Sequence, residues 1–234
     1  MHWIVIIAVV LVLVLVFLAW ASSDIGSNVY ISALCKGKRN DKVVALTFDD
    51  GPNEETTPLV LDILKQHNIK ATFFLIGQKA EKYPHLVQRM VDEGHIVANH
   101  TYSHKGVFPI SSSRKVIDEL QRCSDAIANI IGKHPKLFRP PFGLTNPIIG
   151  TVVRQLDMQV IGWSIRSFDT VKKNKEENIC GRVVGKLHGG AVILLHDRCK
   201  DADHLLQRII EEIKSKEYKV VQLNKLFNIE AYED

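Results

Sequence analysis

The chain has 234 residues, of which 24% are charged, and its formal net charge is +4. This composition excludes an intrinsically disordered chain, and the scattered Lys and Arg residues form no long basic stripe of the kind that binds nucleic acid. Roughly 200 residues follow an apolar N-terminal run, which suits one domain with a sizeable core.

The N-terminal run from Trp3 to Ala21 is apolar throughout. A helix of this length reaches roughly 28 Å, close to the thickness of a bilayer core, and this one lacks the polar face of a soluble helix. Two interpretations remain, namely an uncleaved single-pass anchor and a signal peptide cut near "AWAS" at Ala19–Ser22. The run is longer than a typical signal core and starts without Lys or Arg, so we expect an anchor over residues 1–21.

Residues 22–40 are polar and lack apolar periodicity, which predicts a stalk that leads to a domain over residues 41–234. Strand-like runs in that domain are Val43–Phe48, Ala71–Ile76, His95–Asn99, Gln159–Ser164, Ala191–His196 and Lys219–Leu223. Helical periodicity covers Thr57–His67, Glu81–Glu93, Ser113–Ile131 and Asp201–Lys216. This alternation with short links predicts an α/β fold whose parallel sheet is either open or closed into a barrel.

The cysteines are Cys35, Cys123, Cys180 and Cys199, and no two of them form a CxxC pair. That spacing argues against a zinc-knuckle or thioredoxin-like site. An even number would permit two disulfides in an oxidising compartment, but we expect buried free thiols.

Polar and ionisable residues follow the predicted strands at the same end of each. They are Asp49, Asp50, His100, Arg139, Ser164, Asp169, His196 and Asp197. One such residue would be an ordinary turn residue, whereas five strand ends in register indicate a site at the carboxyl edge of the sheet.

The stretch "NHTYSH" places His100 and His104 four residues apart. If a helix begins there, both rings lie on one face and can bind one metal. A pair of histidines with this spacing is more often simply two surface residues. A catalytic metal site needs three protein ligands, and Asp50 would supply the third. Asp49 is then free to take a proton from the metal-bound water, and Arg139 is expected to hold it bidentately.

These motifs resemble those of the polysaccharide deacetylases, the carbohydrate esterase family 4. "TFDDGP" at Thr47–Pro52, "HTYSH", "RPPFG" and "LLHD" at Leu194–Asp197 are similar to the first, second, third and fifth family motifs, in family order. The resemblance implies a distorted (β/α) barrel and a divalent metal, most often Zn, with Co, Ni or Mn as alternatives. It also implies hydrolysis of N-acetyl groups on amino-sugar glycans such as peptidoglycan or chitin-like polymers.

The resemblance also implies roles for single residues. Asp49 matches the general base and His196 the general acid, which Asp169 orients, while Arg139 tethers the base. The metal ligands would be Asp50, His100 and His104. The substrate-binding positions would be Pro141, Phe142 with its backbone N–H on the oxyanion, Trp163, and Leu194 in the wall of the acetyl pocket.

The fourth motif, "WSIRSFDT" at Trp163–Thr170, departs from the family pattern. Arg166 stands where the family more often has Asp, and Thr170 stands where it has Trp. Arg166 is either solvated or contacts an anionic group of the substrate, so the departure bears on substrate preference more than on the chemistry.

Two other functions are alternatives to an active deacetylase. One is an inactive sugar-binding module, which would usually lack the base or a metal ligand, and the other is a hydrolase of a different non-peptide C–N bond. The anchor favours a large glycan of the cell envelope and an extracytoplasmic catalytic domain, or a secreted one if the helix is cleaved. We expect the glycan and the membrane as partners, with no nucleic acid and no obligate protein partner.

Overall fold

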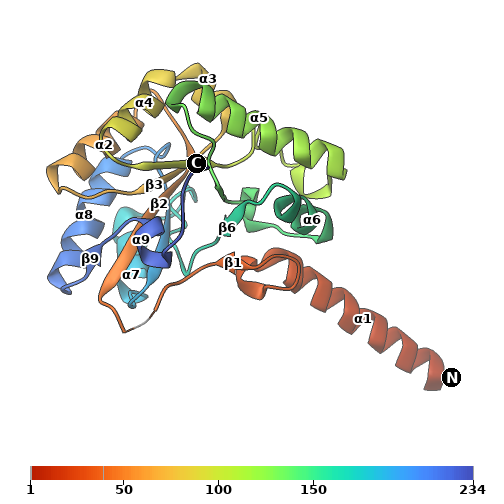
Figure 1. The fold of residues 1–234 in the computed structure, drawn as a ribbon. Helices are drawn as coiled ribbons and strands as arrows, with labels where there is room; N and C mark the ends of the chain where they lie inside the picture. Colours follow the sequence, from red (N-terminus) through yellow and green to blue (C-terminus); the bar gives the residue numbers. More distant parts are fainter. Residues whose placement is uncertain (1, 39, 234) are drawn as a thin grey trace.

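A curled sheet of parallel strands with helices on its outer face forms the body of the protein (Figure 1). The computed structural model describes residues 2–38 and 40–233. The strand order is β1-β6-β5-β4-β3-β2-β8-β7, with β9 beside β2. The strands are β1 Ala33–Leu34, β2 Val43–Gly51, β3 Thr72–Leu75, β4 Ile96–Asn99, β5 Leu137–Phe138, β6 Gln159–Ile161, β7 Ile165–Arg166, β8 Ala191–His196 and β9 Lys219–Val220. This distorted half-barrel confirms the predicted parallel α/β fold.

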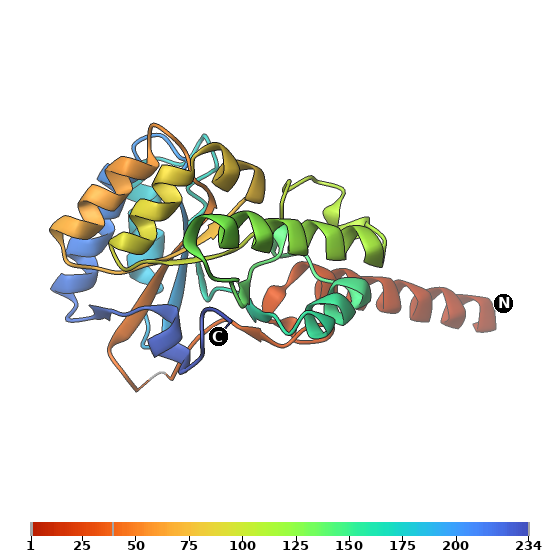
Figure 2. The same ribbon diagram turned by 45° about the horizontal axis from the view of Figure 1, so that its top comes forward.

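Helices cover the convex side of the sheet, and Figure 2 shows them as an outer layer (Figure 2). The covering helices are α2 Thr57–Gln66, α3 Gly77–Lys82, α4 Pro84–Asp92, α5 Ser113–Ile131, α6 Pro147–Gln155, α7 Glu176–Gly185 and α8 Ala202–Ser215. Two helices lie elsewhere: α1 His2–Ser23 projects from the body, and α9 Leu223–Phe227 packs at the amino end of the barrel. Short 3-10 turns are η1 Ile25–Ser27, η2 Phe108–Ile110 and η3 Pro141–Gly143. The helix expected over Glu81–Glu93 is divided, because Pro84 has no N–H to continue α3 and instead starts α4.

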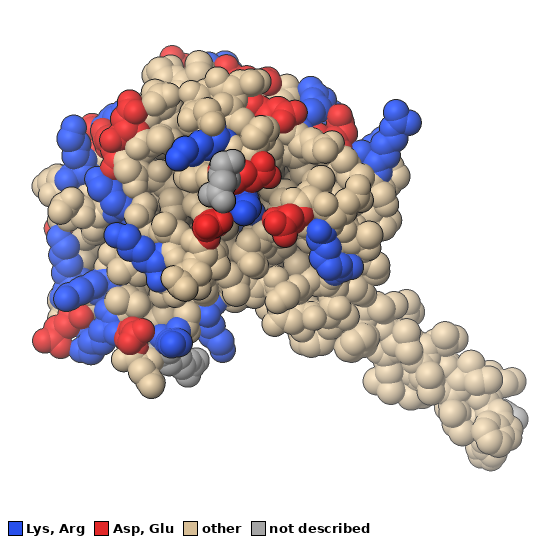
Figure 3. Space-filling view, in the orientation of Figure 1, with Lys and Arg blue, Asp and Glu red and all other residues tan. Residues whose placement is uncertain are grey.

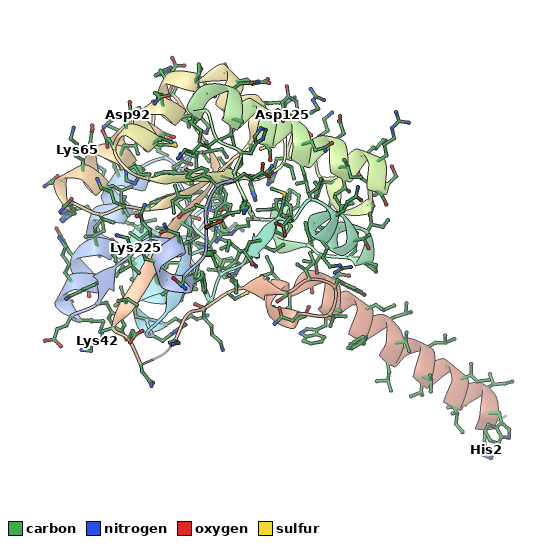
Figure 4. All side chains as sticks on the ribbon, in the orientation of Figure 1. His2, Lys42, Lys65, Asp92, Asp125 and Lys225 are labelled. Atoms are coloured by element: carbon green, nitrogen blue, oxygen red, sulfur yellow. The ribbon has the colours of Figure 1, made fainter. Side chains whose placement is uncertain are left out.

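The two faces of β2 explain how the barrel is filled. Val44, Leu46 and Phe48 face the helices and belong to the large outer core cluster. Ala45 faces inward, in a second cluster that also contains Leu223 of α9. That cluster fills the amino end of the barrel near the start of β2, where Lys42 is labelled in Figure 4 (Figure 4). The cavity that holds the predicted site residues lies at the carboxyl end of the strands.

The apolar N-terminal helix is present as predicted, and it projects from the body as a straight rod (Figures 1 and 3). Its side chains from Trp3 to Trp20 are exposed, and Ala21 is the buried residue where the helix meets the body. Figure 3 shows no charged side chain on this rod (Figure 3). Its length and composition suit either a membrane anchor or a signal sequence.

Residues 22–38 are not a loose stalk, which corrects the expectation for residues 22–40. Ile25 and Ile31 are buried in an apolar cluster of the body, and β1 pairs with β6. The Thr145 N–H donates to the Ser22 carbonyl across 2.9 Å. The sequence gives little signal for this packing, because two isolated isoleucines and a two-residue strand create no period. Residue 39 of the expected stalk lies outside the described residues.

The cysteines differ in burial. Cys123 and Cys180 are buried, whereas Cys35 and Cys199 are half-buried, and all four are free thiols in the structure.

Candidate active site

A cavity of about 460 Å³ opens at the carboxyl ends of the strands. Side chains from β2, β8 and the loops after β4, β5 and β6 line it. Its polar lining residues are Asp49, Asp50, Lys79, His100, Ser103, His104, Arg166, Thr170, His196 and Arg198. Eight of the eleven predicted site residues thus line one cavity, although they come from distant parts of the chain; Arg139, Pro141 and Asp169 do not line it.

The end of β2 is irregular, and this brings both of its carboxylates to the cavity. Successive side chains of a regular strand point to opposite faces, so Asp49 would face the barrel interior and Asp50 the helices. The pairing of β2 with β3 shifts register between Asp49 and Gly51, and Asp50 has a φ of 71°. Gly51 follows because a Cβ there would collide with the carboxylate of Asp197. The bulge therefore places Asp50 beside Asp49.

Asp50 and the two histidines form a compact set of potential ligands. Asp50 Oδ1 lies 3.2 Å from His104 Nε2 and 3.5 Å from His100 Nε2. One ligand atom from each of the three residues lies within 4.8 Å of the others. The three side chains can therefore converge on a single ion.

A helix start at His100 is the condition under which the sequence places both rings on one face; the described residues 100–104 form no helix, yet the two rings meet, with centroids 4.8 Å apart. Asn99 Oδ1 accepts a hydrogen bond from the Thr101 N–H, and Thr101 Oγ1 accepts one from the His104 N–H. Thr101 and His104 both have positive φ values, of 67° and 49°. These two side chain–backbone hydrogen bonds stabilise a tight turn. Short polar side chains such as Asn and Thr commonly compete with helix formation in this way.

The protonation states of this set suit a divalent cation. His100 Nδ1 lies 2.7 Å from the carbonyl of Arg139, which can only accept, so Nδ1 donates and Nε2 is left to face Asp50. Burial and the neighbouring His100 lower the pKa of His104, which favours the neutral ring. Burial alone would raise the pKa of Asp50, but the neighbouring His100, His104 and Arg198 hold that pKa below its usual range.

Asp50 Oδ1 is buried and has no hydrogen-bond donor among the described residues. A buried carboxylate oxygen without a partner is costly unless a cation occupies the site. One Asp and two His with room for water match the donor set of a catalytic metal centre, so the residues fit the metal that the resemblance implies.

Asp49 is held by a buried arginine through one of its two oxygens. Arg139 Nη1 donates to Asp49 Oδ1 across 2.7 Å and to Thr47 Oγ1 across 2.8 Å. Its other nitrogens donate to the carbonyls of Ile161 and Gly162. The bidentate hydrogen bonding expected between Arg139 and Asp49 is therefore wrong. One guanidinium nitrogen donates to the carboxylate, and the other two donate to backbone carbonyls. Among the described residues no hydrogen bond to Asp49 Oδ2 is formed, and this oxygen lies 3.9 Å from His100 Nε2.

His196 at the end of β8 and Asp169 form a second ion pair at the site, beside the Asp49–Arg139 pair. Asp169 Oδ1 accepts from His196 Nδ1 across 2.7 Å, and Oδ2 accepts from the His196 backbone N–H across 2.7 Å. This double contact fixes the ring and leaves Nε2 to face the cavity, 3.9 Å from Asp50 Oδ2. Burial lowers the pKa of His196, but Asp169 outweighs it and the net shift is upward, toward the imidazolium.

The remaining predicted positions surround the cavity, with one exception. Phe142 has a φ of 61°, and its ring lies edge-on to His104. Within residues 2–38 and 40–233, the turn hydrogen bonds use the N–H groups of Gly143 and Leu144, and none uses that of Phe142. Trp163 and Leu194 line the cavity, whereas Pro141 is buried and does not.

Two further cations that the sequence interpretation missed contact Asp50. Arg198 Nε donates to Asp50 Oδ2 across 2.8 Å, and Lys79 Nζ donates to the Asp50 carbonyl across 2.6 Å. Arg198 directly follows the "LLHD" motif, which could have drawn attention to it, whereas nothing local marks Lys79. Arg166 lies at the rim, with its guanidinium over the rings of Trp163 and Phe168.

Comparisons with known proteins agree with this geometry. Residues 36–161 match the polysaccharide deacetylase family. The chain is 36% identical over 197 residues to a peptidoglycan-N-acetylglucosamine deacetylase of Bacillus cereus, covering 82% of this chain and 70% of that one. It is 34% identical over 201 residues to a peptidoglycan-N-acetylglucosamine deacetylase of Listeria monocytogenes, covering 86% of this chain but only 42% of that one.

A crystal structure also matches. It is that of a peptidoglycan N-acetylglucosamine deacetylase in complex with 4-naphthalen-1-yl-N-oxidanyl-benzamide. It superposes with a TM-score of 0.80 at 34% identity and covers 85% of this chain and 94% of that one.

Proposed function

The chain belongs to the polysaccharide deacetylase family, and from that premise we propose that it is a metal-dependent hydrolase that removes N-acetyl groups from a cell-wall glycan. The observation that carries this proposal is the joint arrangement of the cavity. An Asp–His–His ligand set lies between a carboxylate held by Arg139 and an imidazole held by Asp169. The relatives named as peptidoglycan deacetylases support peptidoglycan as the first candidate substrate.

Asp50, His100 and His104 would hold the metal, and a bound divalent ion would supply Lewis acidity for the acetyl carbonyl and the attacking water. Zinc is our first proposal, because this donor set is typical of catalytic zinc, with Co, Ni and Mn as the alternatives.

The chain's own residues would move the protons. Asp49 accepts a proton from the attacking water at its free Oδ2, while Arg139 keeps the carboxylate in place. The unused N–H of Phe142 donates to the oxygen that becomes negative. His196 donates from Nε2 to the leaving nitrogen, which is a poor leaving group until it is protonated, and Asp169 keeps that imidazole charged.

An inactive sugar-binding module is the weaker alternative. Such a module has no use for a general base beside a ligand set, yet Asp49 is present and its Oδ2 is free. The buried oxygen of Asp50 likewise argues for a metal in use.

We further propose that α1 is an uncleaved anchor and that the body lies on the extracytoplasmic side. The burial of Ala21 supports this, because the last turn of the helix is part of the folded body. The mass of the protein extracted from membranes would test it, since a chain that begins after Ala21 would show cleavage.

The function is tested with the purified full chain loaded with zinc. We expect acetate release from peptidoglycan, and chitooligosaccharides serve as the second substrate. Asp49→Asn, loaded with the same metal, is the matched control and should release little acetate. A chain that holds the metal but releases no acetate from either glycan would support the sugar-binding alternative.

A further inference from the structure

Three exposed apolar side chains lie on the body close to the base of α1. The exposed fractions are 58% for Val107, 84% for Ile110 and 38% for Ile148. The Asn146 side-chain amide donates to the Pro109 carbonyl, so the η2 turn is tied to the start of α6. The three side chains therefore belong to one region of the surface.

This region is connected to α1 through the core beneath it. Phe108, between Val107 and Ile110, is buried in the same apolar cluster as Ile25 and Ile31. Those two isoleucines belong to the segment that leaves α1. Figure 2 shows the first turns of α5, and α6, on the side of the body from which α1 projects (Figure 2).

The junction with α1 is held by specific hydrogen bonds. Thr145, just before α6, donates from its N–H to the Ser22 carbonyl across 2.9 Å and from its hydroxyl to the Ala21 carbonyl across 3.2 Å. The direction in which α1 leaves the body is thereby fixed relative to the exposed apolar side chains.

Basic side chains accompany the apolar ones. Lys105, Arg114 and Lys115 are all exposed, on the η2 loop and in the first turn of α5. The acidic side chains in the first two turns of the same helix have other partners: Asp118 lies 3.7 Å from Arg122, and Glu119 accepts from the Ser103 N–H and hydroxyl. The region thus combines apolar tips with positive charge.

We propose that this region is a second membrane contact, in which Val107, Ile110 and Ile148 enter the boundary between headgroups and acyl chains of a bilayer that contains anionic lipid. Apolar tips flanked by Lys and Arg are typical of surfaces that lie at that boundary. The occupant follows from the continuity of this region with α1, and the inference rests on the anchor that is part of the proposed function. We call these three residues with Lys105, Arg114 and Lys115 the lipid-contact region.

The test uses the full chain reconstituted into vesicles of phosphatidylcholine and phosphatidylglycerol. An environment-sensitive fluorophore is attached to Ile110→Cys, and quenching by nitroxide-labelled lipid is measured. Leu59→Cys on α2, where the native side chain is 45% exposed, is the matched control. The unsubstituted chain, labelled in parallel, gives the background from Cys35 and Cys199.

We expect several-fold stronger lipid quenching at position 110 than at position 59. Replacement of Lys105, Arg114 and Lys115 by Glu should weaken the quenching in vesicles with anionic lipid and leave it unchanged in phosphatidylcholine alone. Equal quenching at both positions would overturn the proposal. A label at 110 that is shielded from water but not quenched by lipid, in a chain that cross-links to itself, would assign the region to a second copy instead.

The same samples separate this inference from the proposed activity. Acetate release from peptidoglycan and from a soluble chitooligosaccharide is measured in each. Strong quenching at position 110 without acetate release would refute the proposed activity and leave the lipid contact standing. Acetate release without quenching would do the reverse.

Discussion

Replacement of Arg139 by Met should destabilise the protein strongly. The guanidinium is fully buried, and it pairs with Asp49, whose exposed fraction is 4%. The methionine side chain fills much of the same space but leaves the Asp49 charge without a partner. Breaking a buried ion pair in this way typically costs about 3–5 kcal/mol of unfolding free energy. For a chain of this size, about 2–4 °C of Tm is lost per kcal/mol, so we expect a Tm lower by roughly 6–20 °C.

Thermal unfolding followed by circular dichroism measures the loss, and two variants make the result specific. Arg166→Met removes an exposed arginine at the rim of the same cavity and should lower the Tm by less than about 2 °C. The double variant Asp49→Asn, Arg139→Met also removes the unpaired negative charge of Asp49 and should therefore be more stable than Arg139→Met alone. A double variant as unstable as the single one, or a single variant within about 2 °C of the parent, would refute the argument.

The remaining predictions concern the site itself. Asp49→Asn should retain its metal, by elemental analysis, and lose about 10²–10⁴-fold in acetate release; a loss of less than about threefold would show that Asp49 is not the base. The double variant His100→Ala, His104→Ala should retain less than half of the metal, and full retention would refute these ligands. Asp169→Asn removes the charge that raises the pKa of His196, so the alkaline limb of kcat/KM should move to lower pH. An unmoved limb would mean that Asp169 does not act on His196.

The sequence alone predicts the features of the fold and site that depend on local order. The apolar run into Asp49 and Asp50 identifies β2 and its end, because a strand buried on both faces reads as continuous apolar sequence. The "HTYSH" stretch likewise identifies the loop after β4, and "LLHD" identifies the end of β8. These positions are expected to lie together because the carboxyl ends of parallel strands form one edge of the sheet.

What the sequence could not predict depends on contacts between distant segments. The bulge that turns Asp50 toward the cavity requires a residue without a Cβ at Gly51, next to the Asp197 carboxylate. Asp197 is 147 residues after Asp50 in the chain. The division of Arg139 between Asp49 and two carbonyls requires the position of β6. The packing of residues 22–38 depends on an apolar cluster to which α5 and α6 contribute, so no sequence pattern within residues 22–38 predicts that packing.

If α1 is the anchor proposed above, the packing of residues 22–38 also limits how far the enzyme can work from a membrane. As a flexible linker, these 17 residues would have an average end-to-end span of roughly 20–25 Å and a fully extended reach of about 60 Å. Because these residues are folded onto the body, they cannot act as a flexible tether. With α1 inserted in a bilayer, the cavity would therefore stay at one height above the lipid. Glycan strands would then have to come to the enzyme, so acetyl groups would be removed in a thin layer of wall next to the membrane while the outer layers kept theirs.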